Sequence, residues 1–358
     1  MKTPETTTLH QIAGEILLGE TAVLAGEFAV LPLFLPGAGT ATRKEAAPYL
    51  LLEEAVPAGL VEVIEIGHGH VPEILVKNHG ISPVLILEGD HLIGAKQNRA
   101  VWITILVPGK SETVIPVSCL EQGRWHYRPS GGAGHRAGPW GAAGPAAGSP
   151  TESASAFAAC HAKVSPSMRA AASRDISSSL KRGRGFEVNQ GMIWDRVKGL
   201  SNELGVDSPS SAYLDAAESR RSSIEDLLPR FRPLAGQSGA MVVIGGKLAG
   251  AEIAGSPETY AKLHRKILSP YLFDAIVMRA KLETPPAEKA DAMAEEAATA
   301  GKAGRFWLAA ISDAPCELRP SVGLGRDFRM ESQAIVGGGL ENDGRVVYLS
   351  AFARAGVM

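Results

Sequence analysis

The sequence contains 358 residues, of which 45% are hydrophobic and 21% are charged. This length is enough for one large domain, or for two lobes that bury a substantial core. The 36 basic and 38 acidic residues leave a formal net charge of −2. A chain with this balance has no broad basic face, so we expect neither nucleic acid nor an anionic membrane as its partner.

The cysteines and the apolar runs predict where the protein resides. Cys119, Cys160 and Cys316 are odd in number and show no CxxC or zinc-ligand spacing, which is typical of a reducing compartment. The N-terminal segment lacks the apolar stretch of a signal peptide. No apolar run approaches the roughly 20 residues that a membrane helix needs. We therefore expect a cytoplasmic protein.

Residues 1–128 predict a β-rich lobe. Short runs of Val, Ile and Leu alternate there with turn signals such as Asn78-His79-Gly80 and Pro108-Gly109-Lys110. Runs of this length at near-regular spacing are typical of an antiparallel sandwich or barrel-like sheet. We expect residues 101–117 to form a hairpin around the second of these turns. The predicted strands cover residues 60–66, 74–76, 83–87, 101–107 and 113–117.

Residues 129–166 differ sharply from the rest of the chain. Glycine, alanine and proline dominate this segment, and such a composition cannot bury a core. It predicts a flexible loop or linker. A lid over a functional site is the alternative interpretation.

Residues 167–358 predict an α+β lobe. Apolar residues recur first at helical spacing, then a strand pair spans residues 240–252, and Ser256-Pro257-Glu258 opens a further helix. We expect antiparallel, β-sandwich-like sheets formed from N- and C-terminal strands, with a helical middle section and both lobes in one domain. The predicted helices cover residues 167–181, 190–204, 212–228 and 286–299, and the last predicted strands cover residues 306–311, 316–322, 328–336 and 346–352.

Four consecutive polar residues, Lys96-Gln97-Asn98-Arg99, lie between two apolar runs. On a strand, Lys96 and Asn98 would face one side and Gln97 and Arg99 the other. At least one pair should then point into an interior or a cleft, where burial of polar groups demands partners.

Two interpretations of this run remain open. In the first, Lys96 and Arg99 hold a carboxylate or phosphate while the two amide side chains orient the ligand. In the second, the run is a structural network at a strand edge, with Arg99 paired to Glu88 or Glu121.

A second polar segment follows the predicted hairpin and could lie near the first. Its candidates for ligand binding are Ser118, Glu121, Arg124 and Trp125. Trp125 could stack on a base or sugar, although packing over a sheet is the commoner role for tryptophan. Gln190, at the start of a predicted helix, could help to fill the same cleft or could serve the helix N-terminus.

Cysteine and histidine chemistry is the less favoured interpretation of the remaining candidates. Cys119 would be a nucleophile if a histidine such as His126 lowered its pKa, but the local pattern favours a small buried apolar side chain. His68 and His70 share the spacing of metal ligands on a strand, yet no third ligand lies at suitable spacing. We expect no metal, and the sequence leaves any cofactor unidentified.

The two polar segments carry a resemblance. Residues 87–125, LEGDHLIGAKQNRAVWITILVPGKSETVIPVSCLEQGRW, resemble the ARG and rhodanese-phosphatase-superfamily-associated protein domain family, in which ARG denotes ADP-ribosylglycohydrolase. The matching elements are the GAKQNR run, the Val-Pro pair and the ending PVSCLEQGRW. Residues 189–194, 323–328 and 349–352 are similar to its downstream helix and its last strands.

The chain departs from this family pattern at two polar positions. Glu252 stands where an aspartate is expected, and Tyr348 stands where a histidine is usual. The tyrosine puts an acid or base role for that position in doubt. The Gly/Ala/Pro segment is also longer than the family pattern.

The resemblance implies a domain of undetermined biochemistry and supplies no catalytic residues. Its association with ADP-ribosylglycohydrolases points towards ADP-ribose or other NAD-derived nucleotides. The first hypothesis is therefore a protein that binds such an anionic small molecule. The second is an enzyme that processes such a nucleotide by hydrolysis, with Glu88 or Glu121 as general base, and the third is a non-catalytic interaction scaffold.

Overall fold

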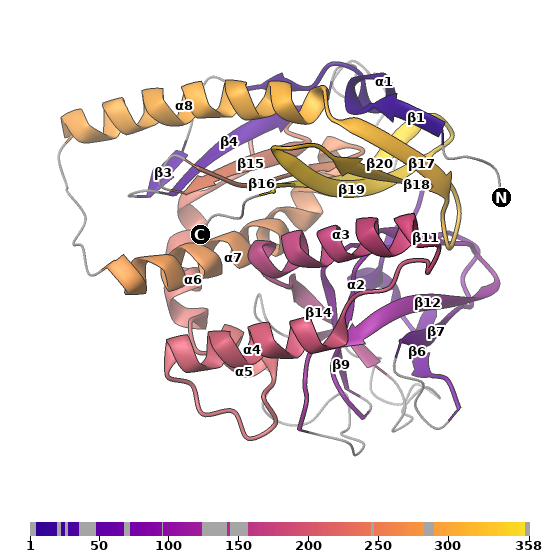
Figure 1. Ribbon diagram of the computed structural model, residues 1–358. Helices are drawn as coiled ribbons and strands as arrows, with labels where there is room; N and C mark the ends of the chain where they lie inside the picture. The colour runs from indigo at the N-terminus through magenta and orange to yellow at the C-terminus, as the bar shows by residue number, and fades with distance from the viewer. Residues whose placement is uncertain are drawn as a thin grey trace.

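A computed structural model describes residues 5–19, 23–25, 28–35, 48–67, 72–94, 96–123, 142–143, 157–244, 247–282 and 290–354. Sheets and helices alternate in layers (Figure 1). Helix α8 (Ala290–Ser312) covers one face of the largest sheet, and helices α3 (Pro166–Lys181) and α7 (Pro257–Leu282) cover its other face. The smaller sheets lie beyond these two helices.

The largest sheet combines strands from the two ends of the chain with two strands from residues 239–254, and together with the helices it confirms the predicted α+β class. Its order is β1-β17-β18-β19-β20-β16-β15-β4-β2, with β3 also paired to β4, and all of its pairs are antiparallel. The strands are β1 (Glu5–Thr8), β2 (Leu17–Leu18), β3 (Val23–Ala25), β4 (Phe28–Phe34), β15 (Gly239–Ile244), β16 (Lys247–Ala254), β17 (Pro315–Pro320), β18 (Arg326–Glu331), β19 (Ile335–Asn342) and β20 (Arg345–Ala353).

Both faces of this sheet are buried. Val30 and Val242 point into a core cluster that includes α7, whereas the adjacent Leu31 and Met241 point into a second cluster beneath α8. Because neighbouring residues of a strand face opposite sides, a strand buried on both faces is a continuous apolar run. Strand β15 shows this pattern throughout its length.

Two smaller sheets are built from the first half of the chain. One has the order β13-β14-β9-β10-β12-β7-β6, and the other has the order β11-β8-β5. The strands are β5 (Leu50–Leu51), β6 (Val61–Glu65), β7 (Glu73–Asn78), β8 (Val84–Ile86), β9 (Asp90–Gly94), β10 (Arg99–Val101), β11 (Ile105–Val107), β12 (Ser111–Cys119), β13 (Ala142–Ala143) and β14 (Phe157–Lys163).

Local signals fix the bounds of helix α4. The Asn189 side chain accepts a hydrogen bond from the Met192 amide, and Gly205 ends the helix with a φ of 62°. These are the expected N-cap and the left-handed C-terminal glycine. The remaining helices are α1 (Leu9–Ala13), α2 (Leu52–Ala55), α4 (Gln190–Leu204), α5 (Tyr213–Glu218), α6 (Arg221–Leu227) and a 3-10 turn at Leu228–Arg230.

Five predicted elements are corrected. Residues 328–336, predicted as one strand, divide between β18 and β19, and residues 212–228, predicted as one helix, divide into α5, α6 and the 3-10 turn. Residues 306–311, predicted as a strand, belong to helix α8. Residues 101–107, predicted as one strand, divide between β10 and β11, which lie in different sheets, so the hairpin with β12 involves β10 alone. The end of the predicted 129–166 loop forms β14, and residues 142–143 form β13; most of the rest of that segment lies outside the described residues.

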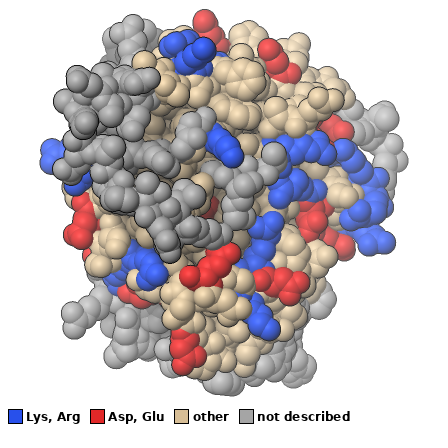
Figure 2. Space-filling view, turned by 60° about the vertical axis from the view of Figure 1, so that its left-hand side comes forward, with Lys and Arg blue, Asp and Glu red and all other residues tan. Residues whose placement is uncertain are grey.

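Charge of both signs is mixed on the surface. On the face shown in Figure 2, basic and acidic side chains lie next to one another. No helix in the described part of the chain is long and apolar enough to cross a membrane.

Candidate functional site

Residues 96–98 form the connection between β9 and β10, and only Arg99 of the four polar residues lies in a strand. The predicted alternation of faces along residues 96–99 is therefore wrong. Lys96 is half-buried, whereas Gln97, Asn98 and Arg99 are 2%, 6% and 0% exposed. Burial, which the sequence predicted for at least one pair of the run, extends to three of its members.

Short contacts join this connection to residues 120–122. The Asn98 amide donates to Oε2 of Glu121 at 3.3 Å, and the Asn98 carbonyl accepts from the Leu120 amide at 2.9 Å. The Gln97 side chain donates to the Gln122 carbonyl at 3.3 Å. The two polar segments of the sequence thus lie side by side, as predicted, and their contacts are to each other.

The Arg99 side chain is held by three groups. Its Nη1 donates to Oε1 of Gln97 at 3.2 Å and to Sγ of Cys119, and its Nη2 lies 3.7 Å from Oε1 of Glu65. Glu65, rather than Glu88 or Glu121, is therefore its acidic partner. Glu65 comes from β6, which the order of the sheet separates from β10, and no local pattern predicts that approach.

The Arg99 guanidinium is incompletely hydrogen-bonded. Within the described residues, Nε and Nη2 of Arg99 and Oε2 of Glu65 are buried without a hydrogen-bond partner. A buried polar atom without a partner costs about 1–3 kcal/mol, and more if it is charged. We call Glu65, Gln97, Asn98, Arg99 and Cys119 the Arg99 cluster.

Gln190 and Ser118, two other predicted binding residues, lie next to this cluster or to the strand that carries Cys119. Gln190 reaches across from α4, so that its Oε1 accepts from the Cys119 amide at 2.7 Å and its Nε2 donates to the Cys119 carbonyl at 2.9 Å. Ser118 accepts a hydrogen bond from the Trp102 indole at 2.5 Å. Arg124 and Trp125 lie outside the described residues.

Cys119 is a buried thiol. Burial raises its pKa to about 11, against the opposing effect of Arg99. This state supports the interpretation of Cys119 as a small buried side chain rather than a nucleophile. His68 and His70, for which metal binding was the less favoured interpretation, lie outside the described residues, and the described part of the chain contains no group of three potential metal ligands close together.

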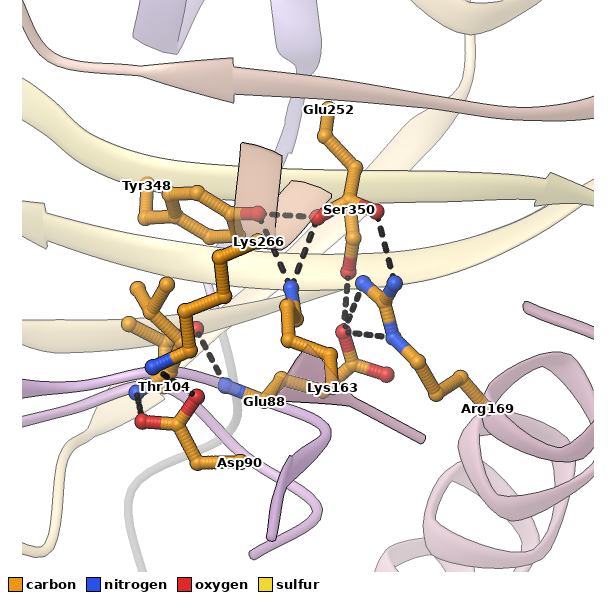
Figure 3. A network of polar contacts seen from close by, with 10 residues as sticks. Glu88, Asp90, Thr104, Lys163, Arg169, Glu252, Lys266, Tyr348 and Ser350 are labelled. Atoms are coloured by element: carbon orange, nitrogen blue, oxygen red, sulfur yellow. Dashed lines mark hydrogen bonds and ion pairs between the residues drawn. The ribbon is translucent and has the colours of Figure 1, made fainter. Parts of the chain in front are cut away.

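A second polar site lies in the core, where the large sheet faces α3 (Figure 3). Arg169 of α3 donates from Nε and Nη2 to Oε2 of Glu88, at 3.0 and 2.6 Å, and from Nη1 to Oε1 of Glu252 at 2.6 Å. Ser350 of β20 donates to Oε2 of Glu88 at 2.8 Å, and Thr104 accepts from the Glu88 amide at 3.3 Å. We call these residues, with Lys163 and Tyr348, the buried network.

Lys163 and Tyr348 complete the buried network around Glu252. Lys163 donates from Nζ to Oε2 of Glu252 at 2.7 Å and to the Tyr348 hydroxyl at 2.9 Å, and that hydroxyl donates to Glu252. Burial alone would raise the pKa of the Glu252 carboxyl, but Arg169 and Lys163 outweigh it and hold the pKa at about 2. Burial and the adjacent Arg169 lower the pKa of Lys163 to about 8.

A neighbouring branch contains a third buried cation. Lys266 of α7 lies 2.8 Å from Oδ1 of Asp90 and 3.0 Å from Oε2 of Glu53. Burial would lower the pKa of Lys266, but the two carboxylates raise it above its ordinary value. Each of the three cations Lys163, Arg169 and Lys266 therefore contacts at least one carboxylate, as burial of a charge requires.

The sequence identified part of this network. Glu88 was a candidate general base, and Glu252 and Tyr348 were the two departures from the family pattern, yet their contact with one another was not predicted. Lys163 was missed because it lies in the segment that composition assigns to a loop. Arg169 was missed because it lies beside the apolar face of its helix. A charged residue next to an apolar helical face was the one signal available.

Comparison with known families decides the assignment. A family model described as ARPP-1, the ARG and Rhodanese-Phosphatase-superfamily-associated Protein domain, matches residues 18–352. The chain belongs to the ARPP-1 family. The ARPP-1 match covers the Arg99 cluster and the buried network together. No curated protein and no solved structure matches the chain.

Proposed function

We propose that the protein binds an anionic small molecule and that the Arg99 cluster supplies its donors. The observation that carries this proposal is a contrast between two arginines, Arg99 and Arg169, both 0% exposed. Each of the three guanidinium nitrogens of Arg169 donates to a carboxylate, whereas Nε and Nη2 of Arg99 have no hydrogen-bond acceptor among the described residues. An acceptor bound at Arg99 offsets the cost of these buried donors.

The guanidinium group favours one class of ligand. Its fork of parallel N–H groups matches the two oxygens of a carboxylate or phosphate, and two such donors of Arg99 remain unused. The association of the family with ARG proteins supports ADP-ribose or another NAD-derived nucleotide as the phosphate-bearing molecule. Opening around Arg99 accompanies binding, because its side chain is fully buried.

A structural role for the cluster is the second candidate. The contacts of Gln97 and Asn98 with residues 120–122 lie within the chain, which is what a scaffold requires. An enzymatic role for Glu88 has less support, because Arg169 and Ser350 already occupy its carboxylate. Glu121 is the candidate base that lies nearer to the Arg99 cluster, through its contact with Asn98.

Calorimetric titration of ADP-ribose and NAD into the wild-type protein and into Arg99→Lys tests the proposal. Lysine keeps the charge but loses the planar fork, so we expect the Kd to rise by about tenfold or more. Arg169→Lys is the matched control, because it perturbs a buried arginine whose three guanidinium nitrogens all donate to carboxylates. The proposal fails if millimolar nucleotide gives no heat, or if Arg99→Lys binds as the wild type does.

A further inference from the structure

An open cavity of 370 Å³ lies at the outer end of α3, and its strands belong to a different sheet from the strands of the Arg99 cluster. Its volume falls in the range of small-molecule sites, about 300–1,000 Å³. It is formed by α3, three strands at one edge of the large sheet, and the residue that follows β20. The lining residues are Thr6, Ser177, Lys181, Pro315, Glu317, Arg319, Arg329, Glu331 and Arg354.

The register of the large sheet brings three of these residues into one row. Thr6 pairs with Glu317, Glu317 with Arg329, and Arg329 with Gly338. Directly opposite residues of neighbouring strands point to the same face. A polar row therefore crosses the floor of the cavity from β1 to β18 and ends at a glycine in β19.

Gly338 gives the Arg329 guanidinium its room. A Cβ at position 338 would lie 2.8 Å from Nη1 and 2.9 Å from Cζ of Arg329. Arg329 is held from behind by Asp327, which accepts from its Nε at 2.9 Å and from its Nη2 at 2.5 Å. Neither hydrogen bond to Asp327 uses Nη1, so the Asp327 contact leaves this nitrogen of the 5% exposed arginine available to the cavity.

The lining carries an excess of positive charge. Four basic and two acidic side chains line the cavity, and Asp327 behind Arg329 lowers the net formal charge of the group to +1. Lys181 and Arg354 share Glu331, at 2.5 and 3.3 Å, and Arg319 lies 2.8 Å from Glu317. The two acids therefore order the cations around the cavity without neutralising all of them, and this favours an anionic occupant.

Two buried polar atoms at the cavity have no partner in the described part of the chain. These are Oγ of Ser177, a residue that is 5% exposed, and Nε of Arg319. Ser177 and Lys181 lie one helical turn apart on α3, so they share the face towards the cavity. A hydroxyl, an ammonium and guanidinium groups thus surround one space from several elements.

From these features we propose that the cavity binds a phosphate group, either as free phosphate or on a small phosphorylated molecule. Donors on α3, β17, β18 and the residue after β20 surround the site, which suits a tetrahedral group with three acceptor oxygens better than a planar carboxylate. No aromatic side chain lines the cavity in the described residues, so the phosphate and not a base is recognised. This site is independent of the proposed function, because it shares no residue with the Arg99 cluster.

Isothermal titration of the full chain at constant ionic strength tests this proposal, with phosphate, ADP-ribose and acetate as the three probes. We expect phosphate to bind and acetate to bind at least tenfold more weakly. If phosphate and ADP-ribose compete, the occupant is a phosphate group of the nucleotide. If phosphate binds and ADP-ribose does not compete with it, the occupant is free phosphate. The proposal is overturned if titration with millimolar phosphate gives no heat of binding, or if acetate binds as tightly as phosphate.

Two serine variants distinguish the loss of a contact in the cavity from a general effect of substitution in α3. Ser177→Ala removes a hydroxyl that lines the cavity, and Ser179→Ala removes a hydroxyl that is also buried and unpartnered but does not line it. We expect Ser177→Ala to weaken phosphate binding about threefold to tenfold, the worth of one hydrogen bond, and Ser179→Ala to leave it unchanged.

Arginine variants distinguish this site from the Arg99 cluster. Arg329→Lys should weaken phosphate binding at least tenfold, while Arg221→Lys, in an ion pair on α6 outside the cavity lining, should leave it unchanged. Equal phosphate affinity in Ser177→Ala and Ser179→Ala, or retention of binding by Arg329→Lys, contradicts the proposed site. Loss of phosphate binding in Arg99→Lys alone also contradicts it, and would assign the phosphate to the Arg99 cluster.

Discussion

Lys163 donates a hydrogen bond to Glu252 at 2.7 Å across 89 positions of sequence, and both side chains are completely buried. Lys163 ends β14 in one of the smaller sheets, and Glu252 lies in β16 of the large sheet. Through Arg169, the same carboxylate is linked to Glu88. The buried network therefore ties the two sheets and α3 together with ionic contacts rather than with apolar packing alone.

Loss of one member of this pair should be costly. Lys163→Met removes one of the two cations that balance the buried Glu252 carboxylate. We therefore expect the free energy of unfolding to fall by about 3–5 kcal/mol. Urea unfolding monitored by circular dichroism measures this change. Lys262→Met is the control, because Lys262 pairs with Glu54 at an exposed site, 53% and 35% accessible, where loss should cost less than about 1 kcal/mol.

The double variant Lys163→Met/Glu252→Gln tests whether the charges themselves are coupled. It removes one cation and one anion, so the network stays neutral and should be less destabilised than the sum of the two single variants. Additive losses would show that Lys163 and Glu252 do not interact.

The pH dependence of stability should report Glu252. Its pKa lies at about 2 in the folded protein, below the ordinary value of 4.5, so folding favours the ionised form. This contribution is present above about pH 4.5 and is lost as the pH falls from 4.5 towards 2. Urea unfolding can be measured from about pH 2.5 to about pH 6, which spans this window. The free energy of unfolding should fall more steeply towards acid pH in the wild type than in the double variant. Parallel curves would contradict the assigned pKa.

Gln190 should stabilise the end of β12. Gln190→Ala removes both hydrogen bonds to the Cys119 backbone and leaves two buried groups unpaired, so we expect a loss of about 1–3 kcal/mol. Hydrogen exchange of the Cys119 amide should accelerate in the variant. Gln122→Ala is the control, because the Gln122 side chain is exposed and its loss should change stability by less than about 0.5 kcal/mol. Unchanged exchange at Cys119 would argue against the bridge.

The buried cysteines should be unreactive in the folded state. Burial raises the pKa of Cys119 to about 11 and that of Cys316 to about 12, so little thiolate exists at neutral pH. Alkylation at pH 8, followed by peptide mass spectrometry, should label both residues at least about 100-fold more slowly in the folded protein than in urea. Rapid labelling of Cys119 would instead revive its interpretation as a nucleophile.

Local signals predicted some elements of the fold well. The helix at residues 190–204 coincides with α4 because apolar spacing, an Asn189 cap and a terminal glycine all act within one segment. The strand pair of β15 and β16 was predicted for the same reason: two apolar runs flank a glycine turn. The placement of β1 next to β17 confirms that N- and C-terminal strands share a sheet.

Elements that depend on distant contacts were predicted less well. Residues 306–311 contain Phe306, Trp307 and Leu308, which favour a strand locally, but α8 continues through them and packs on the large sheet. Residues 96–98 lie in a connection rather than a strand because Asn98 is held by residues 120 and 121. Tertiary contacts outweighed local preference in both places.

The same limit applies to the candidate site. Proximity of the two polar segments was predictable, since β10 and β12 form a hairpin-like pair. The approach of Glu65 to Arg99 and of Lys163 to Glu252 depends on the order of strands in separate sheets, which no local pattern specifies. Sequence therefore located the Arg99 cluster but missed its acidic partner and most of the buried network.

A crystal structure of the protein grown with ADP-ribose tests the central claim most directly. The account predicts a ligand oxygen within hydrogen-bond distance of Nε or Nη2 of Arg99, the two donors that lack an acceptor among the described residues. Ordered water alone at these nitrogens, with ADP-ribose bound elsewhere or not at all, would contradict it and would leave Arg99 a structural residue.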